Sequence, residues 1–567
     1  MRRRFILGCV LLAAALAGCG SSSGSASGAR GLLVETGAGP VEGFEADGVF
    51  SYRGIPYAAP PVGELRWNPP TDPAPWTDTL AVTEKPNICP QTAFGGLPVP
   101  GFMPSEDCLY LNVDAPTEGS DLPVMVWVHG GAFTLGEGVQ TDGGTAGDLI
   151  ARQTGMVVVS MNYRLGQLGF LAHSELTAES PDGASGNYGL MDQTAAFVWV
   201  RENIAAFGGD PENVTIFGES AGAFSVCSHL ASAKSAGLFA SAILQSGSCE
   251  RPWPMLAAAE AQGDAFAAAL ECDAEDDVLA CMRAKSADDV LAALPPAPNF
   301  GFNPSDEPTG SWGPVLDGSF FTEQPSDSFA TGNFNQVPIM LGFTREEARL
   351  FVWLGEMADP PLEVTADNYV DLIAHFLGGN TELAARAAEE YPLEDYSEPA
   401  VALAAVATDT IFRCPGKLEA AKLAPFTPTH LYQFEYPDGH SQLEVVLPFI
   451  GAELPSYDLG AFHGADIPYV FGYDPLLEIN FEDFSTTLNT WEAGTADEAL
   501  WLEILGYFSR FAATGNPSAE GGIQWPTYDE EEDQHLVFDT TVSVGSNAAE
   551  KCDFWEGEDY LVPELAN

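Results

Sequence analysis

The chain has 567 residues, of which 46% are hydrophobic and 34 are phenylalanine, so it can bury a large core. Its 81 acidic residues against 22 Lys and Arg give a formal charge of −59, spread in short runs that indicate a solvated or, alternatively, a salt-adapted surface. Such a charge repels phosphate groups, which argues against nucleic acid or an anionic membrane surface as a direct partner.

The N-terminus has the pattern of an export signal. Three arginines at residues 2–4 precede an apolar run over residues 5–15, which is too short to span a bilayer comfortably. Leu-Ala-Gly-Cys at 16–19 resembles the lipobox of bacterial lipoproteins, which implies a signal peptide at 1–18 and lipidation of Cys19. An ordinary signal cut nearby is the alternative. We expect an exported bacterial protein, periplasmic or at the cell surface, held by its lipid through a Ser/Gly-rich tether at 19–30.

Cysteine use fits export. Of the ten cysteines, Cys9 lies in the signal and Cys19 in the lipobox, which leaves an even number of eight. Disulfides are therefore expected, although eight cysteines allow 105 pairings. No CxxC or Cys/His cluster has the spacing of a metal site, so none is predicted.

After residue 30 there is no further linker and no internal repeat. Short strands are predicted at residues 41–44 and 50–52, followed by strands at 109–113, 124–128 and 156–161, the last two apolar throughout. Residues 192–207 have helical apolar spacing, which Gly208 and Gly209 end. More strands are predicted at 214–217, 242–245, 338–342 and 431–434. The alternation indicates an α/β fold with a large, mainly parallel sheet covered on both faces.

A candidate nucleophile follows the strand at 214–217. Gly-Glu-Ser-Ala-Gly at 218–222 leads into an apolar stretch with helical character. A sharp strand-to-helix turn on Gly-x-Ser-x-Gly exposes the serine, here Ser220, and both glycines are needed because a Cβ would clash. A turn that ends a strand, with Ser220 as a helix cap, is the alternative.

Ser220 needs a base and an acid, which follow it in this chain order on such a turn. Besides the near neighbour His229, five histidines follow: residues 375, 430, 440, 463 and 535. His463 stands out because it lies in a Gly-flanked loop that could approach a serine closely. For the acid, Glu346 and Glu347 sit where the strand at 338–342 ends, although a carboxylate there can also serve a helix start.

An oxyanion-binding segment follows the strand at 124–128. His-Gly-Gly-Ala-Phe at 129–133 lets the amides of Gly130 and Gly131 turn inward, and the Ala221 amide would add a third donor. The alternative is a Gly-rich turn without a binding role.

These and other motifs resemble the type B carboxylesterases, the group that includes cholinesterases and bacterial para-nitrobenzyl esterases. The resemblance runs from about residue 41 to about residue 555. Its markers are Tyr-Arg-Gly-Ile-Pro-Tyr at 52–57, Glu-Asp-Cys-Leu-Tyr-Leu-Asn at 106–112, the segments 129–133, 162–166, 169–171 and 217–222, and Gln-Ser-Gly-Ser at 245–248. It implies one α/β-hydrolase domain over residues 31–567.

The resemblance also implies site residues. It puts the nucleophile on Ser220, the base on His463 and the acid on Glu347, with Glu346 a minor candidate because Ala348 stands where the family usually has Gly. The other positions that match are the oxyanion donors Gly130, Gly131 and Ala221, the buried hydrogen-bonding residues Glu219 and Ser246, and Trp253 in the acyl pocket.

The family's disulfides fall on Cys89–Cys108, Cys272–Cys281 and Cys414–Cys552, and Cys227 and Cys249 pair only by subtraction. In cholinesterases the first of these loops is longer and carries a tryptophan that holds a quaternary ammonium. Here it has Phe94 and Phe102 but no Trp, so choline specificity is not expected.

We therefore expect a serine carboxylesterase that acts on small-molecule esters through an acyl-enzyme, without a metal or organic cofactor. Amidase, carbamate hydrolase and lactone hydrolase activities on the same site remain alternatives, since pocket shape decides among them. A non-catalytic adhesion or binding relative is a further alternative, which the presence of all triad candidates disfavours.

Overall fold

A computed structural model describes residues 31–91, 104–138, 147–296, 310–358, 360–437, 456–480, 485–546, 551–558 and 560–561, with the backbone alone for 474–480 and 485–490. The predicted signal peptide, Cys19, the tether, Phe94 and Phe102 lie outside these residues. Among the described residues, no helix combines the length and apolar character needed to cross a membrane.

The centre of the molecule is an 11-stranded sheet, counted over the described residues, in the order β16-β15-β12-β11-β10-β9-β7-β8-β6-β4-β3. In this spatial order, every adjacent pair between β15 and β8 is parallel. The pair β16-β15 at one edge and the pairs β8-β6, β6-β4 and β4-β3 at the other are antiparallel. The strands are β3 Phe44–Ala46, β4 Val49–Pro56, β6 Tyr110–Pro116, β7 Leu122–Val128, β8 Val157–Met161, β9 Gly209–Glu219, β10 Ser241–Gln245, β11 Ile339–Thr344, β12 Thr429–Phe434, β15 Gln534–Phe538 and β16 Ser543–Ser546. The predicted α/β class and mainly parallel sheet are confirmed.

Both faces of the sheet are buried. Along β7, Val124, Val126 and Val128 belong to one hydrophobic core, and the alternate residues Met125 and Trp127 belong to another. Since side chains alternate across a strand, each core covers one face. Helix α5 (Ala221–Ala231) packs on β7, β9 and β10, and α17 (Ala496–Thr514) contacts β7 and β9.

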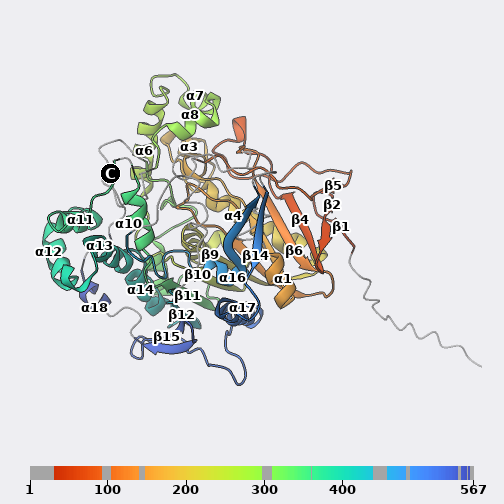
Figure 1. The fold of residues 1–567 in the computed structure, drawn as a ribbon. Coiled ribbons are helices and arrows are strands. Elements are labelled where there is room, and N and C mark those ends of the chain that lie inside the picture. The colour runs from red at the N-terminus through yellow and green to blue at the C-terminus, as the bar shows by residue number, and fades with distance from the viewer. Residues whose placement is uncertain are drawn as a thin grey trace, which may run out of the picture.

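The remaining helices surround the sheet, as Figure 1 shows, with α11, α12 and α13 at one end and the small sheet of β1 Leu33–Glu35, β2 Pro40–Glu42 and β5 Leu80–Ala81 at the other. A hairpin of β13 Tyr473–Asn480 and β14 Ser485–Thr490 forms a third sheet. The larger helices are α1 Asp148–Thr154, α4 Tyr188–Asn203, α6 Leu256–Ala269, α7 Val278–Ala284, α9 Pro325–Thr331, α10 Arg349–Glu356, α11 Tyr369–Phe376, α12 Thr381–Glu390, α13 Pro399–Thr408 and α14 Cys414–Leu423. The shorter ones are α2 Gly166–Phe170, α3 Ser174–Glu179, α8 Ala287–Ala292, α16 Ile467–Phe471 and α18 Cys552–Trp555.

One predicted strand needs correction. Residues 41–44 do not form a single strand, because the chain leaves the small sheet after Glu42 and enters the main sheet at Phe44. Gly43 lies between them, where an added Cβ would come within 2.3 Å of the Ser51 carbonyl oxygen. The predicted helix at 192–207 starts earlier, at Tyr188, and ends in a 3₁₀ turn over Ile204–Phe207.

The sheet topology brings the candidate residues to one edge. Gly130 follows β7, Ser220 follows β9, Ser246 follows β10 and Glu347 follows β11, and these four strands run parallel side by side. Their carboxyl ends therefore meet at the same edge of the sheet, the usual position for a ligand site in such folds.

Candidate active site

The turn between β9 and α5 is as sharp as the sequence predicts. Ser220 has φ 55° and ψ −123°, a conformation that costs a residue with a side chain about 1–3 kcal/mol. Its amide donates to the Gln245 carbonyl at 2.9 Å. A Cβ on Gly222 would lie 2.0 Å from the Val128 carbonyl oxygen, and one on Gly218 would lie 2.6 Å from the Gly222 carbonyl carbon. Both glycines are thus required by close backbone approach.

His463 lies in the loop before α16, buried beside this turn. Its Nδ1 is 2.6 Å from Glu347 Oε2, and its Nε2 is 3.1 Å from Glu219 Oε1, on the residue that precedes Ser220. The imidazole packs against both Phe351 and Phe412, with ring centroids 4.8 and 4.9 Å away. The loop histidine and the strand-end carboxylate, 116 residues apart, therefore meet at the turn.

The two candidate acids have different surroundings. Glu347 is fully buried, and its Oε1 accepts the Thr344 amide at 2.8 Å while Oε2 faces the imidazole. Glu346 instead accepts from Arg345 Nε at 2.6 Å and from the Ala461 amide at 2.9 Å. Glu346 therefore ties the His463 loop to the strand end, whereas Glu347 is the carboxylate in contact with the ring.

The glycine segment after β7 lies against the serine. A Cβ on Gly130 would come within 3.1 Å of Ser220 Cβ and 2.8 Å of the Glu219 carbonyl oxygen. Among the described residues, the amides of Gly130 and Gly131 donate to no backbone carbonyl. Ala221 is the first residue of α5, where an amide has no partner within the helix. In the described part of the chain, none of the three predicted oxyanion donors has a backbone acceptor for its N–H, and Gly130 and Ala221 adjoin Ser220.

His129 fixes this glycine segment. Its Nδ1 is 2.8 Å from the Gly130 carbonyl oxygen, and its ring stacks on Tyr163 with centroids 4.3 Å apart. The Tyr163 hydroxyl donates to the His129 carbonyl at 2.9 Å. Burial lowers the pKa of His129 to about 4, so the ring is neutral at pH 7 and adds no charge to the site.

Three buried carboxylates surround His463. Burial by itself would lower its pKa, but the charges of Glu219 and Glu347 outweigh burial and raise it to about 9. Burial raises the pKa of Glu219 to about 8, against the attraction of the imidazolium. His463 and Glu219 therefore compete for one proton. The pKa of His463 is raised because two carboxylates contact its ring.

Asp466 is the third carboxylate and was not predicted. Its Oδ2 accepts from Gln245 Nε2 and from the Tyr432 hydroxyl, both at 2.9 Å. Burial raises its pKa, and its charge also favours protonation of His463. In the sequence, the only signal for Asp466 is its position three residues after His463. Its partners Gln245 and Tyr432 lie in strands β10 and β12.

Ser246 and Trp253 lie on the segment that follows β10. Ser246 also has a positive φ of 55°, and its buried Oγ has no hydrogen-bond partner among the described residues. Trp253 packs on Phe224 of α5 with ring centroids 6.2 Å apart, and Phe224 lies one helical turn after Ser220. The indole therefore packs against the first turn of the helix that follows Ser220.

All four predicted disulfides are present: Cys89–Cys108, Cys227–Cys249, Cys272–Cys281 and Cys414–Cys552. They indicate an extracellular or secreted protein. No group of His, Cys, Asp and Glu in the described part of the chain could hold a metal ion.

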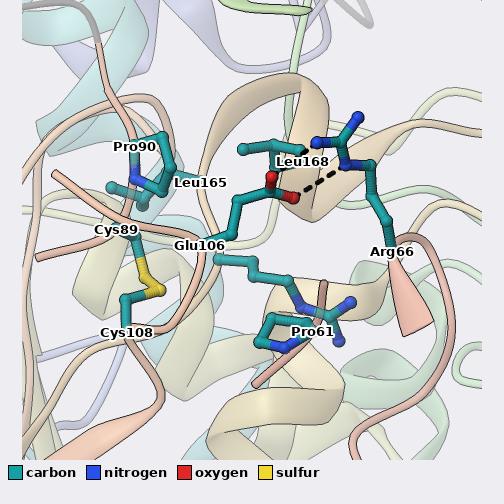
Figure 2. Close-up of a pocket in the computed structure, with 9 residues that line it drawn as sticks. Pro61, Arg66, Cys89, Pro90, Glu106, Cys108, Leu165 and Leu168 are labelled. Atoms are coloured by element: carbon teal, nitrogen blue, oxygen red, sulfur yellow. Dashed lines mark hydrogen bonds and ion pairs between the residues drawn. A yellow bond between two sulfur atoms is a disulfide. The ribbon is translucent and has the colours of Figure 1, made fainter. Parts of the chain in front are cut away.

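A small pocket beside Cys89–Cys108 is a separate feature (Figure 2). Arg66 crosses it to Glu106, with Nε to Oε2 at 2.7 Å, and also donates to the Lys285 carbonyl at 2.8 Å. These contacts hold the base of the disulfide loop to the segment around α7.

Comparisons with known proteins agree with this geometry. A family model described as "Carboxylesterase family" matches residues 30–555. The chain is 35% identical to the para-nitrobenzyl esterase of Bacillus subtilis (strain 168) over 522 residues, which is 90% of this chain and 96% of that protein. It is 33% identical to an acylcarnitine hydrolase of Mus musculus over 534 residues, 90% and 86% of the two chains. A solved PNB esterase structure superposes with a TM-score of 0.73 at 33% identity, covering 93% of this chain and 99% of that one.

The position of Glu219 predicts its effect on His463. In a Glu219→Gln variant the negative charge at 3.1 Å from Nε2 is lost, so protonated His463 is less stabilised and its pKa falls. An NMR titration of ¹⁵N-histidine-labelled protein measures this pKa, with His463→Gln to assign the signal. Glu346→Gln is the matched control and should leave the pKa nearer to its original value. An equal pKa in the parent and the Glu219→Gln protein would contradict this electrostatic account.

Proposed function

This chain belongs to the carboxylesterase family and is a carboxylic ester hydrolase, and on that basis we propose that it works through a Ser220–His463–Glu347 triad and an acyl-enzyme. The observation that supports the triad best is the imidazole of His463, with Nδ1 2.6 Å from Glu347 Oε2 and Nε2 3.1 Å from Oε1 of Glu219, the residue before Ser220. The domain is proposed to be a single α/β-hydrolase unit over residues 31–567.

The proposed reaction begins with attack of Ser220 Oγ on the ester carbonyl carbon, while His463 Nε2 takes the hydroxyl proton. The imidazolium then protonates the leaving alkoxide, and the acyl group remains on Ser220. Water repeats the sequence and releases the carboxylic acid. Glu347 accepts the Nδ1 proton in a hydrogen bond, which keeps Nε2 in the form that accepts a proton. Every step moves a proton or an acyl group, so no metal or organic cofactor is expected.

The oxyanion is proposed to bind to the amides of Gly130, Gly131 and Ala221. Their amides have no backbone acceptor among the described residues, which supports this role, and the His129 ring contacts the Gly130 carbonyl oxygen at 2.8 Å. Each such donor contributes on the order of 3 kcal/mol to the transition state. Glu219 and Ser246 would tune the triad from buried positions, and Trp253 would line the acyl side of the site.

The substrate is a small-molecule ester. The name of the first relative above specifies para-nitrobenzyl esters and that of the second acylcarnitine, and both are carboxylic esters. We propose the same bond class for this chain, with p-nitrophenyl esters as convenient probes.

Replacing the nucleophile tests the proposal directly. Ser220→Ala should lower kcat for p-nitrophenyl acetate by about 10⁶-fold, because without the hydroxyl no acyl-enzyme can form. The same variant should no longer react with a fluorophosphonate probe, while circular dichroism shows an unchanged fold. Substantial turnover or labelling of this variant would show that another residue is the nucleophile.

The choice between the two acids is tested by a matched pair of substitutions. Glu347→Gln should lower kcat by about 10⁴-fold, because an amide cannot hold the imidazole in the required tautomer. Glu346→Gln removes a neighbouring carboxylate that contacts Arg345 rather than His463, so a loss below about tenfold is expected. The two acids are distinguished by measuring kcat for ester hydrolysis in both variants. A larger loss of kcat in Glu346→Gln than in Glu347→Gln would assign the acid to Glu346.

We also propose that the protein is anchored through lipid on Cys19, on the pattern Leu-Ala-Gly-Cys at residues 16–19. In a bacterial expression host, the full chain should partition with membranes and incorporate labelled palmitate. Cys19→Ala should do neither, since it removes the thiol that takes the lipid. Membrane association that survives this substitution would exclude the anchor.

A further inference from the structure

The segment from Ser246 to Trp253 lies along one face of helix α5. Ser220, Phe224 and Cys227 are four and three residues apart, so they share that face of the helix. A Cβ on Gly247 would lie 2.9 Å from the Ser220 carbonyl oxygen and 2.8 Å from Ala223 Cβ. The segment thus starts in contact with the nucleophile turn.

The segment is bonded to the helix at its midpoint and packed on it at its end. Cys249 forms a disulfide with Cys227, and both residues are fully buried. Four residues later, the Trp253 ring packs on Phe224 at 6.2 Å between centroids. We call residues 246–253 the Trp253 wall. The disulfide is therefore a covalent link between this wall and α5, the helix that follows Ser220.

Contacts on the opposite side anchor the same segment. The Cys249 amide donates to the buried Glu419 of α14, and Glu250 accepts from Lys422 of the same helix. The Trp253 amide donates to Gln324 Oε1 at 2.9 Å, and Gln324 Nε2 donates to the Trp253 carbonyl at 2.8 Å. The wall is thus fixed from both sides, by a disulfide toward α5 and by polar contacts toward α9 and α14.

We propose that Cys227–Cys249 and Gln324 are specificity-determining positioning residues, which keep Trp253 against Phe224 and so limit the length of the acyl chain that the site accepts. The inference rests on the proposed acyl-enzyme at Ser220. It concerns only the shape of the acyl side, because neither the disulfide nor Gln324 contacts His463 or the oxyanion amides in the described residues. With the disulfide removed, α5 and the segment that carries Trp253 are no longer joined, so Phe224 and Trp253 can separate even though Gln324 still holds the Trp253 backbone.

The test compares a Cys227→Ala/Cys249→Ala double variant with a Cys272→Ala/Cys281→Ala control. The control also loses one short-range disulfide, but that bond joins the end of α6 to α7, away from the Ser220 turn. The measured quantity is kcat/KM for p-nitrophenyl octanoate divided by kcat/KM for p-nitrophenyl acetate. We expect this ratio to rise about tenfold in the first variant and to stay at the parent value in the control.

Gln324→Ala provides a second route to the same result, since it releases the Trp253 backbone without opening a disulfide. Its octanoate/acetate ratio should also rise, and it decides the matter if the double cysteine variant fails to fold. A series of acetate esters with alcohols of graded size completes the test and should show no comparable change.

The outcomes separate this inference from the proposed function. Full fluorophosphonate labelling of Ser220 with an unchanged acyl ratio in both wall variants would overturn the inference and leave the triad intact. A change confined to the alcohol series would overturn the acyl assignment. Loss of labelling in the parent protein would instead count against the triad itself.

Discussion

The approach of three backbone segments around Ser220 is the constraint on which the rest of the structure depends. The carboxyl end of β7, the turn from β9 into α5 and the segment after β10 pass so closely that Gly218, Gly222 and Gly247 have no room for a Cβ. Backbone packed this tightly can hold Ser220 in a strained conformation, because relaxing the turn would require all three segments to move. The same contact places the Gly130 amide, the proposed nucleophile and the Trp253 segment within one small volume.

The charge distribution around His463 differs from that elsewhere in the interior. Two buried arginines of this acidic chain are each paired with a carboxylate, in Arg53–Asp114 and Arg164–Asp192. Around His463, the carboxylates of Glu219 and Glu347 contact one imidazole and Asp466 adds a third acidic group, and among the described residues no Lys or Arg forms an ion pair with any of the three. An imidazolium formed during ester cleavage would therefore be stabilised by its surroundings. The cost is a base whose pKa lies above that of a free imidazole.

The disulfides serve different parts of this arrangement. Cys414–Cys552 joins α14 to the C-terminal helix α18, and Cys89–Cys108 closes a loop beside the Arg66–Glu106 pair. Cys227–Cys249 is the one of the four that joins the nucleophile helix to the segment carrying Trp253. The proposed chemistry thus rests on a sheet edge common to many hydrolases, whereas substrate range would depend on how loops are fastened above it.

The sequence by itself determined the local features. The strand runs, the elbow glycines and the oxyanion segment follow from short patterns, three disulfides follow from the family motifs and the fourth follows by subtraction. The structure confirms the four disulfides and the predicted strands other than the one at 41–44. Local patterns suffice there because strand alternation, helical spacing and glycine conformation are set within a few residues. The family motif already favoured Glu347 as the acid, but only the tertiary structure showed that Glu347 contacts the imidazole while Glu346 contacts Arg345, and that Asp466 bonds to Gln245 and Tyr432. It also divided residues 41–44 between two sheets. These outcomes depend on which distant segments pack together, and local spacing by itself does not say which of two neighbouring carboxylates faces a loop more than a hundred residues away.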